Sequence, residues 1–578
     1  AYPVEKIKYT KGITEGSGSI KEINRSKRCK RNHQNHQRKG EYVIMKKKVI
    51  VACGGAVATS TIAANDTVDE DGKVNGIMYQ EGLPLVDEGD YTFSIFCDDS
   101  SESGEFIMLD EFKKQTNVDV DLKIYPYETA TERLNLDLNS GDYADVIGGW
   151  TLSDNAILTY GVNQGVFIPL EDYFEKYCPN ISAILDLPGV REKMTAPDGH
   201  IYTIPYVCTD TTVGYSPYIN TKWLENVGMR MPTTTDEFEA VLKAFKEQDA
   251  NGNGDASDEI PFSTDPNNKH IEAMAGYFGL PMNKLGIAIQ NEKVVYGGVS
   301  DTYREFLSWF HKLYAEGLVD VELYTQDSST WEGKGNQDLY GVSIAYGSNE
   351  FTGIPAAEER GDFDSMPVLN TDKDGIWLRD TEGFSVYRTQ AVITNKAEHP
   401  EIICRWFDNA FALENGIGCN RGPVGVIVNK EDDGYHAIDT TTLSEEDQEK
   451  YSWGNLWPQS LPKYLPVDFE FVEEHPMYDE KKATEEAYEA NLTKEIIPSY
   501  WIDLDKIDTF SDTNTAIKDF FEQQQAQFVC GELDIDNDAD WQAYVDGMYS
   551  LGLEDWVATQ GIEEIAIILC SRLTTHIS

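Results

Sequence analysis

The chain has 578 residues, which is enough for two or three domains with substantial hydrophobic cores. Hydrophobic residues make up 40% and aromatic residues 11% of the sequence, and this composition excludes a wholly disordered protein. The 100 acidic residues outnumber the 48 basic ones, so the formal net charge is −52. This charge excludes a protein that binds nucleic acid or an anionic membrane surface, because both ligands require basic patches. It favours a protein exposed to salt-rich fluid outside the cell, or one with neutral or cationic ligands.

The N-terminal residues differ in charge from the rest of the chain. Residues 1–44 are polar and basic, and we expect them to be a non-native upstream extension, with Met45 as the true start. Three lysines and a mildly apolar stretch follow, so residues 45–64 are typical of an export signal and not of a membrane span. Residues 50–54 resemble a lipobox, in which Cys53 would be lipidated after cleavage. Because only four apolar residues precede Cys53, an anchored lipoprotein and a cleaved secreted protein both remain open, and both are extracellular.

A linker is predicted over residues 65–90, which are acidic, Gly-rich and without periodicity. Beyond it, alternating apolar residues predict strands at 91–96 and 118–124, and each strand is followed by an amphipathic helix. A third, short strand ends at the sequence Gly-Gly-Trp150. Strands that alternate with helices predict the α/β class, with a parallel sheet covered by helices.

The ends of these strands are the first candidate binding site. In open α/β sheets, ligands bind outside the carboxyl ends of the strands. Segments 96–100 and 148–154 lie at two such ends. We therefore predict that four residues of these segments contact the ligand, namely Asp98, Asp99, Trp150 and Asp154.

A loop rich in oxygen-bearing side chains follows an amphipathic helix that begins at the capping-box residues Thr234 and Glu237. Ca²⁺ takes about 6–8 oxygen ligands, and Gly254 allows the sharp turn that such a loop needs, so we predict a structural calcium site. The pattern matches the first half of an EF-hand loop, although its closing Glu comes one position early and no helix follows. The alternative is a solvated turn in a very acidic protein. The predicted ligands are Asp249, Asn251, Asn253, Asp255, Asp258 and Glu259.

Known catalytic signatures are missing from the sequence, which contains no nucleophile elbow, P-loop, HExxH motif or Gly-rich dinucleotide fingerprint. The nine cysteines are scattered singly, which predicts neither a disulfide scaffold nor a zinc site. Paired carboxylates are abundant, and a glycosidase needs only two that are adjacent in space. Sequence spacing therefore leaves a glycosidase open.

Several aromatic residues lie in polar or Gly-rich surroundings. Trp150 follows two glycines, and Trp331 and Tyr346 lie in polar, Gly-containing stretches. Trp377 and Tyr387 flank an acidic segment. Sugar rings present an apolar face and a rim of hydroxyl groups, so their sites need flat aromatic rings beside carboxylates and amides. As a set these residues favour a saccharide ligand, although each of them singly fits ordinary packing equally well.

Longer motifs in this order resemble the family 1 extracellular solute-binding proteins of ABC importers, and among them the alginate-oligosaccharide binders. The resemblance runs from about residue 91 to residue 560. Its main carriers are SGDYADVIGGW (140–150), APDGHIYTIPY (196–206), MPTTTDEFEAVLKAF (231–245) with DANGNGDASDEIP (249–261), and QFVCGELDIDNDADWQAYVDGMYSLGL (527–553).

The resemblance implies a two-lobed periplasmic-binding-protein type 2 fold with hinged lobes. The first lobe would comprise residues 91–206 and 391–420, and the second lobe residues 207–390. Residues 421–560 would pack on both lobes, and 561–578 would be an atypical tail. The crossing between the lobes adds Tyr206 and Asp210 to the candidate ligand residues, and Trp150 resembles the stacking aromatic residue of the first lobe.

The resemblance also implies calcium in the loop, with the side chains of Asp249, Asn251, Asn253 and Glu259 and the carbonyl of Asp255 as ligands. Whether Ser257 or Asp258 completes the set remains open. The implied function is a non-catalytic, monomeric receptor that captures an oligosaccharide and delivers it to ABC permease subunits, with no nucleic-acid partner. The alternatives are a secreted carbohydrate-active enzyme, such as a glycoside hydrolase or lyase, and a receptor for a non-sugar solute such as a peptide.

Overall fold

The structure is a computed structural model, and it describes residues 67–70, 72–99, 105–265, 270–353, 362–438, 440–466, 469, 471–472, 476–497, 501–559 and 564–565. All of them belong to one of the two compact units into which the chain divides, Val57–Ser578. The predicted extension and export signal, with Cys53, lie outside the described residues, as does most of the predicted tail. In the described part of the chain, no helix is both long and apolar enough to cross a membrane.

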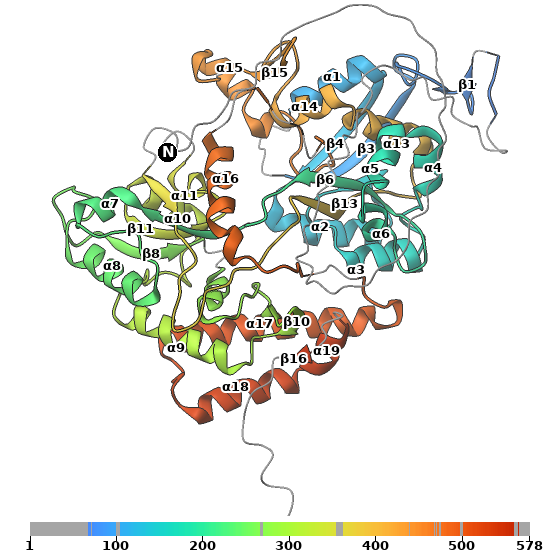
Figure 1. The fold of residues 1–578 in the computed structure, drawn as a ribbon. Coiled ribbons are helices and arrows are strands. Elements are labelled where there is room, and N and C mark those ends of the chain that lie inside the picture. Colours follow the sequence, from blue (N-terminus) through green and yellow to red (C-terminus); the bar gives the residue numbers. More distant parts are fainter. Residues whose placement is uncertain are drawn as a thin grey trace, which may run out of the picture. The chain divides into compact units, whose positions relative to one another are not determined.

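The first sheet has five strands in the order β4-β3-β5-β13-β6 (Figure 1). Strand β3 pairs in parallel with β4 and β5, as the alternation of strands and helices predicts. Strand β13 returns from far along the chain and pairs antiparallel with both β5 and β6. The strands are β3 (Tyr91–Asp98), β4 (Val118–Tyr125), β5 (Val146–Gly148), β6 (Thr203–Thr209) and β13 (Phe384–Ile393).

Helices pack on this sheet and form the core of the first lobe with it. Trp406 is fully buried there, and its ring meets that of Phe93 edge-on at 5.3 Å between centroids. The helices are α1 (Ile107–Thr116), α2 (Tyr127–Ser140), α4 (Glu171–Tyr177), α5 (Pro179–Leu185), α6 (Val190–Met194), α13 (Pro400–Ala410) and α14 (Leu413–Arg421).

The stretch predicted as a linker is part of this lobe from Lys73 onward. Strands β1 (Lys73–Val74) and β2 (Met78–Tyr79) form a hairpin, and four apolar side chains of the stretch are buried in the first core. The prediction failed because these apolar residues are too few and too irregularly spaced to give a periodic signal. They are Val74, Met78, Leu85 and Val86.

The second sheet has four strands in the order β12-β7-β11-β8. Strand β11 pairs in parallel with β8 and antiparallel with β7. Helix α8 is capped by Thr234 as predicted, since the Thr234 side chain accepts a hydrogen bond from the N–H of Glu237, and the Glu237 carboxylate reaches back to the N–H of Thr233. The elements are β7 (Ser216–Asn220), β8 (Ile260–Thr264), β11 (Tyr340–Ala345), β12 (Phe363–Ser365), α7 (Thr221–Asn226), α8 (Thr235–Glu247), α9 (Asp301–Ala315), α10 (Ser328–Asn336) and α11 (Asn349–Thr352).

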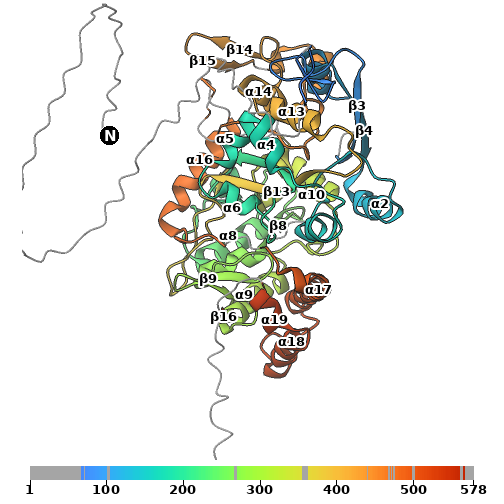
Figure 2. The ribbon, with the colours of Figure 1, turned by 90° about the vertical axis from the view of Figure 1, so that its right-hand side faces the viewer.

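The C-terminal helices extend the second core. In both views α17, α18 and α19 lie side by side, and α17 packs against α9 (Figures 1 and 2). Strand β10 pairs with β9 and β16 to form a small separate sheet. These elements are α17 (Ile507–Cys530), α18 (Asp538–Ser550), α19 (Leu553–Thr559), β9 (Ile287–Gln290), β10 (Lys293–Tyr296) and β16 (Glu564–Ile565).

Two sheets with separate hydrophobic cores make this a two-lobed α/β fold, as expected. Strand β6 of the first sheet leads through residues 210–215 into β7 of the second, and β13 brings the chain back. A later segment gives the hairpin of β14 (Val428–Glu431) and β15 (Gly434–Ala437), then α15 (Glu445–Lys450) and α16 (Pro476–Tyr488). The chain therefore passes between the two sheets after β6 and again before β13.

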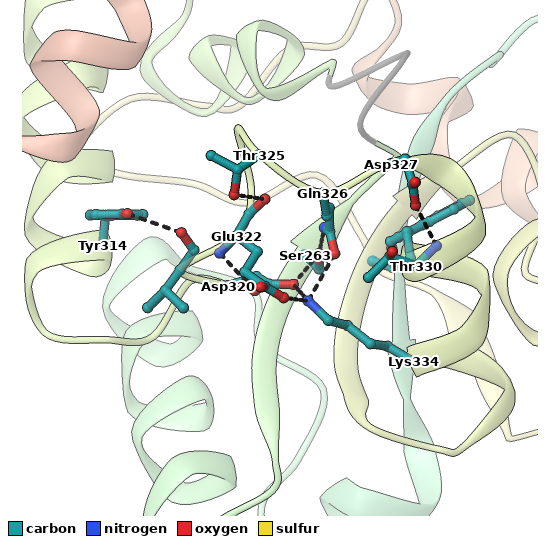
Figure 3. A network of polar contacts seen from close by, with 12 residues as sticks. Ser263, Tyr314, Asp320, Glu322, Thr325, Gln326, Asp327, Thr330 and Lys334 are labelled. Carbon is teal, nitrogen blue, oxygen red and sulfur yellow. Dashed lines mark hydrogen bonds and ion pairs between the residues drawn. The ribbon is translucent and has the colours of Figure 1, made fainter.

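A buried polar network joins α10 to the second sheet (Figure 3). The Lys334 ammonium group donates to Asp320 and to Gln326, both at 2.8 Å, and lies 2.8 Å from Glu322. Ser263 of β8 in turn donates to Asp320 at 3.2 Å. These bonds satisfy the Asp320 carboxylate, whose side chain is only 3% exposed.

Candidate ligand-binding cavity and calcium loop

A cavity of about 550 Å³ lies where the crossing strands meet the loops of the second lobe. The ends of β6 and β13 contribute one part of its lining, and the loops that follow β11 and precede β13 contribute others. The polar and aromatic lining residues include Asp210, Tyr215, His270, Tyr346, Asp380 and Tyr387. A second cavity of about 520 Å³, lined by Asn291, Asp374, Asn491 and others, contains none of the predicted ligand residues.

Asp210 is held in place by three hydrogen bonds. Its carboxylate accepts from the hydroxyl groups of Ser385 at 2.5 Å and Tyr346 at 3.2 Å, and from the N–H of Thr211 at 2.8 Å. Ser385 lies on the returning strand β13, whereas Tyr346 follows β11. The predicted crossing residue Asp210 therefore connects the hinge to the second lobe at the cavity wall.

Asp380 is a cavity carboxylate that the sequence did not single out. One of its oxygens accepts the N–H of Gly214 at 2.7 Å. The residue is accessible to solvent within the cavity, yet the surrounding protein removes enough water to raise the pKa of the carboxyl group to about 6. The only sequence signal was the acidic segment between Trp377 and Tyr387.

Charged groups surround Tyr346 on the second-lobe side. The Lys481 ammonium lies 3.7 Å above the Tyr346 ring and donates to the carbonyl of Gly214 at 2.9 Å. Burial lowers the Lys481 pKa to about 8, against the opposing effect of neighbouring carboxylates. Glu350 accepts the N–H of Tyr346 at 2.9 Å, and burial raises the pKa of its carboxyl group.

Three aromatic rings from the first sheet lie together beside the cavity. Tyr206 and Tyr387 stack at 5.5 Å, and Trp150 meets Tyr387 edge-on at 5.4 Å. Trp150 is 46% exposed, which is unusual for a side chain of this size. The structure thus brings together Trp150, Tyr206, Asp210 and Tyr346 of the predicted ligand residues.

Asp98 supports the turn at Trp150, and the neighbouring Asp99 is also buried. Asp98 is fully buried, and its carboxylate accepts the N–H groups of Trp150 at 2.9 Å and Thr151 at 2.6 Å. Asp99 is 2% exposed and accepts the N–H of Gln459 at 2.7 Å. Their predicted ligand contacts are corrected to a positioning role, because buried carboxylates with these partners do not face a ligand.

The two glycines next to Trp150 make close contacts within the protein. A Cβ atom on Gly148 would lie 2.2 Å from the Leu461 side chain. Gly149 has a φ of +140°, and a Cβ atom there would lie 2.4 Å from the Asp98 carboxylate. Gly149 therefore has to be glycine for Asp98 to hold the Trp150 turn, whereas Gly148 allows the close packing of Leu461.

Three further predicted ligand residues are held by contacts within the protein. Asp154 forms a bidentate ion pair with Arg388 of β13, at 2.8 and 2.5 Å. Trp331 is 2% exposed, packs on Phe351 and donates to Ser343 at 3.2 Å, so it is a core residue and has no face open to a ligand. Trp377 contributes to the cavity lining but is also only 2% exposed. Helix packing buried both tryptophans, and their polar sequence neighbours gave no sign of it.

Helix α16 braces loops beside the cavity with three charged side chains, which the sequence did not single out. Besides Lys481, Glu480 accepts the N–H and hydroxyl of Ser348 at 2.9 and 2.6 Å. Glu485 accepts the N–H of Thr212 at 2.6 Å. Acidic surface helices have the same composition, so the sequence held no signal that these charges face inward.

The loop between α8 and β8 folds its side-chain oxygens toward one another. The N–H of Gly254 donates to Asp249 at 3.0 Å, and the amides of Asn251 and Asn253 donate to Asp258 at 3.2 and 2.7 Å. Gly254 has a φ of +95°, which confirms the predicted sharp turn.

Glu259 closes the loop, and only one of its two carboxylate oxygens accepts a hydrogen bond from the described residues. Its Oε1 accepts the N–H of Ala250 at 2.8 Å, whereas Oε2 is buried without a hydrogen-bond partner among the described residues. Burial also raises the pKa of this carboxyl group. A buried, unpartnered carboxylate oxygen is costly, and a bound cation would satisfy it. The loop residues therefore fit a calcium ion.

One further group of metal-capable side chains occurs in the described part of the chain. Glu431, Asp433 and His436 bring one ligand atom each within 4.8 Å of the others on the β14–β15 hairpin. Glu431 and Asp433 are exposed, and His436 already contacts Asp433 at 3.0 Å. Exposed pairs of this kind are common on acidic surfaces.

The fold and the cavity correspond to a known class of protein. Residues 102–416, more than half of the chain, match the bacterial extracellular solute-binding protein family. The chain belongs to this family, and it is a solute-binding protein and not an enzyme.

The individual relatives include proteins of sugar import. The fructooligosaccharide ABC transporter substrate-binding protein FusA of Streptococcus pneumoniae is 31% identical over 393 residues, which cover 66% of this chain and 71% of FusA. A solved structure of a FusA EF-hand mutant in complex with fructo-nystose has a TM-score of 0.70 at 27% identity and covers 81% of this chain and 98% of that chain. The alginate-binding protein AlgQ2 without calcium ion shares the fold, with a TM-score of 0.67, 22% identity, and coverage of 83% and 99%.

Proposed function

We propose that this protein is the substrate-binding protein of an ABC importer, which captures an oligosaccharide in the cavity at Asp210 and delivers it to membrane permease subunits. The observation that carries the proposal is the exposed Trp150 ring beside Tyr387, which lines the same cavity as the carboxylates of Asp210 and Asp380. Trp150 and Tyr387 offer flat faces to sugar rings, and Asp210 and Asp380 offer acceptors to sugar hydroxyl groups. The similarity to FusA supports the same ligand class.

The Trp150 ring provides the first test of this proposal. Replacing Trp150 with Ala should weaken oligosaccharide binding about tenfold or more, equivalent to about 1.4 kcal/mol, because a stacking surface is lost. Isothermal titration calorimetry with fructo-, malto- and xylo-oligosaccharides measures the affinity. Tyr549→Ala, which removes a 38% exposed aromatic ring on α18, is the matched control and should bind normally. Normal binding by Trp150→Ala would remove the aromatic group from the site.

The calcium loop is the second part of the proposal. The six predicted ligands would hold one Ca²⁺, which would cross-link the end of α8 to the start of β8. The buried Oε2 of Glu259 and the EF-hand of the similar FusA support it. Bound calcium stabilises the folded state by mass action, by about 2.7 kcal/mol at 100 times its Kd.

The chelator response of the melting temperature tests the calcium site. EDTA should lower the melting temperature of the unmutated protein. The double variant Asp249→Ala, Asn251→Ala should have a lower melting temperature than the unmutated protein, and EDTA should not change it. The control Asp364→Ala, at an exposed carboxylate on β12, should respond like the unmutated protein. If elemental analysis finds no calcium and EDTA changes nothing in the unmutated protein, the loop is a solvated turn.

Export and anchoring complete the proposal. The family is extracellular, and the predicted export signal with Cys53 supports a lipoprotein that is held at the outer face of the membrane. As a monomer, such a protein would encounter its permease within the plane of the membrane. Cell fractionation distinguishes this anchored form from a secreted one.

A further inference from the structure

The cavity is rich in carboxylates. Asp210 and Asp380 line it directly, and Glu350 lies just behind Tyr346. These acids come from three separate segments, which follow β6, precede β13 and follow β11. Folding has therefore concentrated negative charge at one place, beyond the general acidity of the chain.

The basic side chains near the cavity either contact groups of the protein or are uncharged at pH 7. Lys481 donates to the carbonyl of Gly214 and covers the Tyr346 ring, and it is surrounded by Glu480, Glu350 and the two lining carboxylates. His270 stacks on Tyr215 at 4.1 Å, and burial lowers its pKa to about 4, so it is neutral at pH 7. Among the described lining residues, Lys284 is the one remaining cationic side chain, and it is exposed.

Carboxylates interact differently with neutral and acidic sugars. A neutral sugar donates hydroxyl hydrogen bonds to Asp210 and Asp380, and such charge-assisted bonds are strong. A uronate residue would instead bring a further negative charge into a partly enclosed space, where like charges repel strongly and water screens them poorly.

We propose that this cavity selects oligosaccharides by charge: it accepts uncharged, hydroxyl-rich chains and rejects chains that carry uronate carboxylates, with Asp380 as the specificity-determining residue. The inference rests on the proposed function and names its ligand class. Asp380 has this role because it is accessible within the cavity and a single N–H, that of Gly214, donates to it among the bonds of the described residues. Asp210, by contrast, already accepts three hydrogen bonds from the protein and has less acceptor capacity left for a ligand.

A matched pair of ligands isolates the effect of charge. The first ligand is the neutral oligosaccharide that binds most tightly in a panel of fructo-, malto- and xylo-oligosaccharides of three to five units. The second is the same molecule, or for pentose chains its uronate-substituted counterpart, with a carboxylate at one terminal unit. Calorimetry at pH 7.5 and low salt should give at least tenfold weaker binding for the acidic ligand. Added salt should reduce that difference, because it screens charge repulsion, and should leave neutral binding nearly unchanged.

Single-residue variants then show which carboxylate weakens the binding of the acidic ligand. Asp380→Asn should recover at least threefold of the lost affinity for the acidic ligand, whereas Asp364→Asn, at an exposed position on β12, should recover none. Equal or tighter binding of the acidic ligand by the unmutated protein would overturn the selectivity and leave the proposed function intact. If the acidic ligand still binds Asp380→Asn as weakly, relative to the neutral ligand, as it binds the unmutated protein, the role of Asp380 is overturned. If no oligosaccharide of either kind binds, the proposed function itself is wrong.

Discussion

The carboxyl group of Asp408 shows how strongly burial can change the pKa of a single residue. It lies on α13, is 6% exposed, and accepts hydrogen bonds from the N–H of Ile181 at 2.8 Å and the amide of Asn180 at 3.0 Å. Burial raises the pKa of its carboxyl group to about 7, although these donors and the nearby Arg405 oppose the shift. The folded protein therefore holds a proton on Asp408 at a pH where the unfolded chain has lost it.

The pH dependence of stability tests this assignment. Between about pH 4 and pH 7 the folded state binds more protons at Asp408 than the unfolded state does, so stability should fall as pH rises through this range. The contribution reaches about 1.4 kcal/mol per pH unit and is constant above pH 7. In urea unfolding at a series of pH values, Asp408→Asn should flatten this component, whereas the exposed Asp519→Asn should not. An identical slope in the Asp408 variant would refute the assignment.

Helix α10 shows that tertiary contacts, and not local propensity, hold some elements in place. It contains Gly333 and Gly335, each of which disfavours a helix by about 1 kcal/mol relative to Ala. Gly335 is nonetheless required, because a Cβ atom there would lie 2.1 Å from the carbonyl oxygen of Phe351. Two side chains anchor the helix, namely the buried Trp331 and Lys334 with its network (Figure 3).

Removing the Lys334 charge should destabilise the second lobe. Lys334→Met leaves the buried Asp320 carboxylate without its cation, and we expect a loss of about 1–3 kcal/mol in the free energy of unfolding. Chemical denaturation measures the loss. The control Lys222→Met removes an exposed lysine at the start of α7 and should cost less than about 0.5 kcal/mol. Equal stability of the two variants would show that the network contributes nothing.

At the scale of the whole molecule, the cavity depends on segments that are far apart in the chain. Its walls combine the end of β6, the loop after β11 and the start of β13, and α16 braces two of these loops. A ligand that contacts both lobes binds more tightly when the lobes are close enough for all of its contacts to form. Because a ligand shifts a conformational equilibrium only through such a difference in affinity, it should favour the closed arrangement.

Small-angle scattering tests this expectation of closure. A saturating neutral oligosaccharide should decrease the radius of gyration of the protein, because bridging contacts draw the lobes together. Trp150→Ala at the same ligand concentration should show a smaller decrease, since less of it is bound. A radius of gyration that does not change at full occupancy would mean that the lobes are fixed before binding.

Features that depend on a few neighbouring residues could be predicted from the sequence alone. The loop from Asp249 to Glu259 contains its donors and its turn within one short segment, and the capping box of α8 spans four residues. Strand alternation likewise predicted the parallel pairing of β3 and β4. The order of the longer motifs indicated the two-lobed family.

Only the tertiary structure decided which residues, far apart in the sequence, meet at the cavity. Asp210 and Asp380 are far apart in a chain with 100 acidic residues, and nothing local distinguishes them from solvated acids. Trp331 and Trp150 both follow polar or glycine residues, yet packing buried one and exposed the other. The physical reason is that spacing along the chain fixes the faces of a helix or strand, whereas the partner of each face depends on long-range packing. The sequence alone therefore determined the family and the loop, and the fold selected the residues of the cavity.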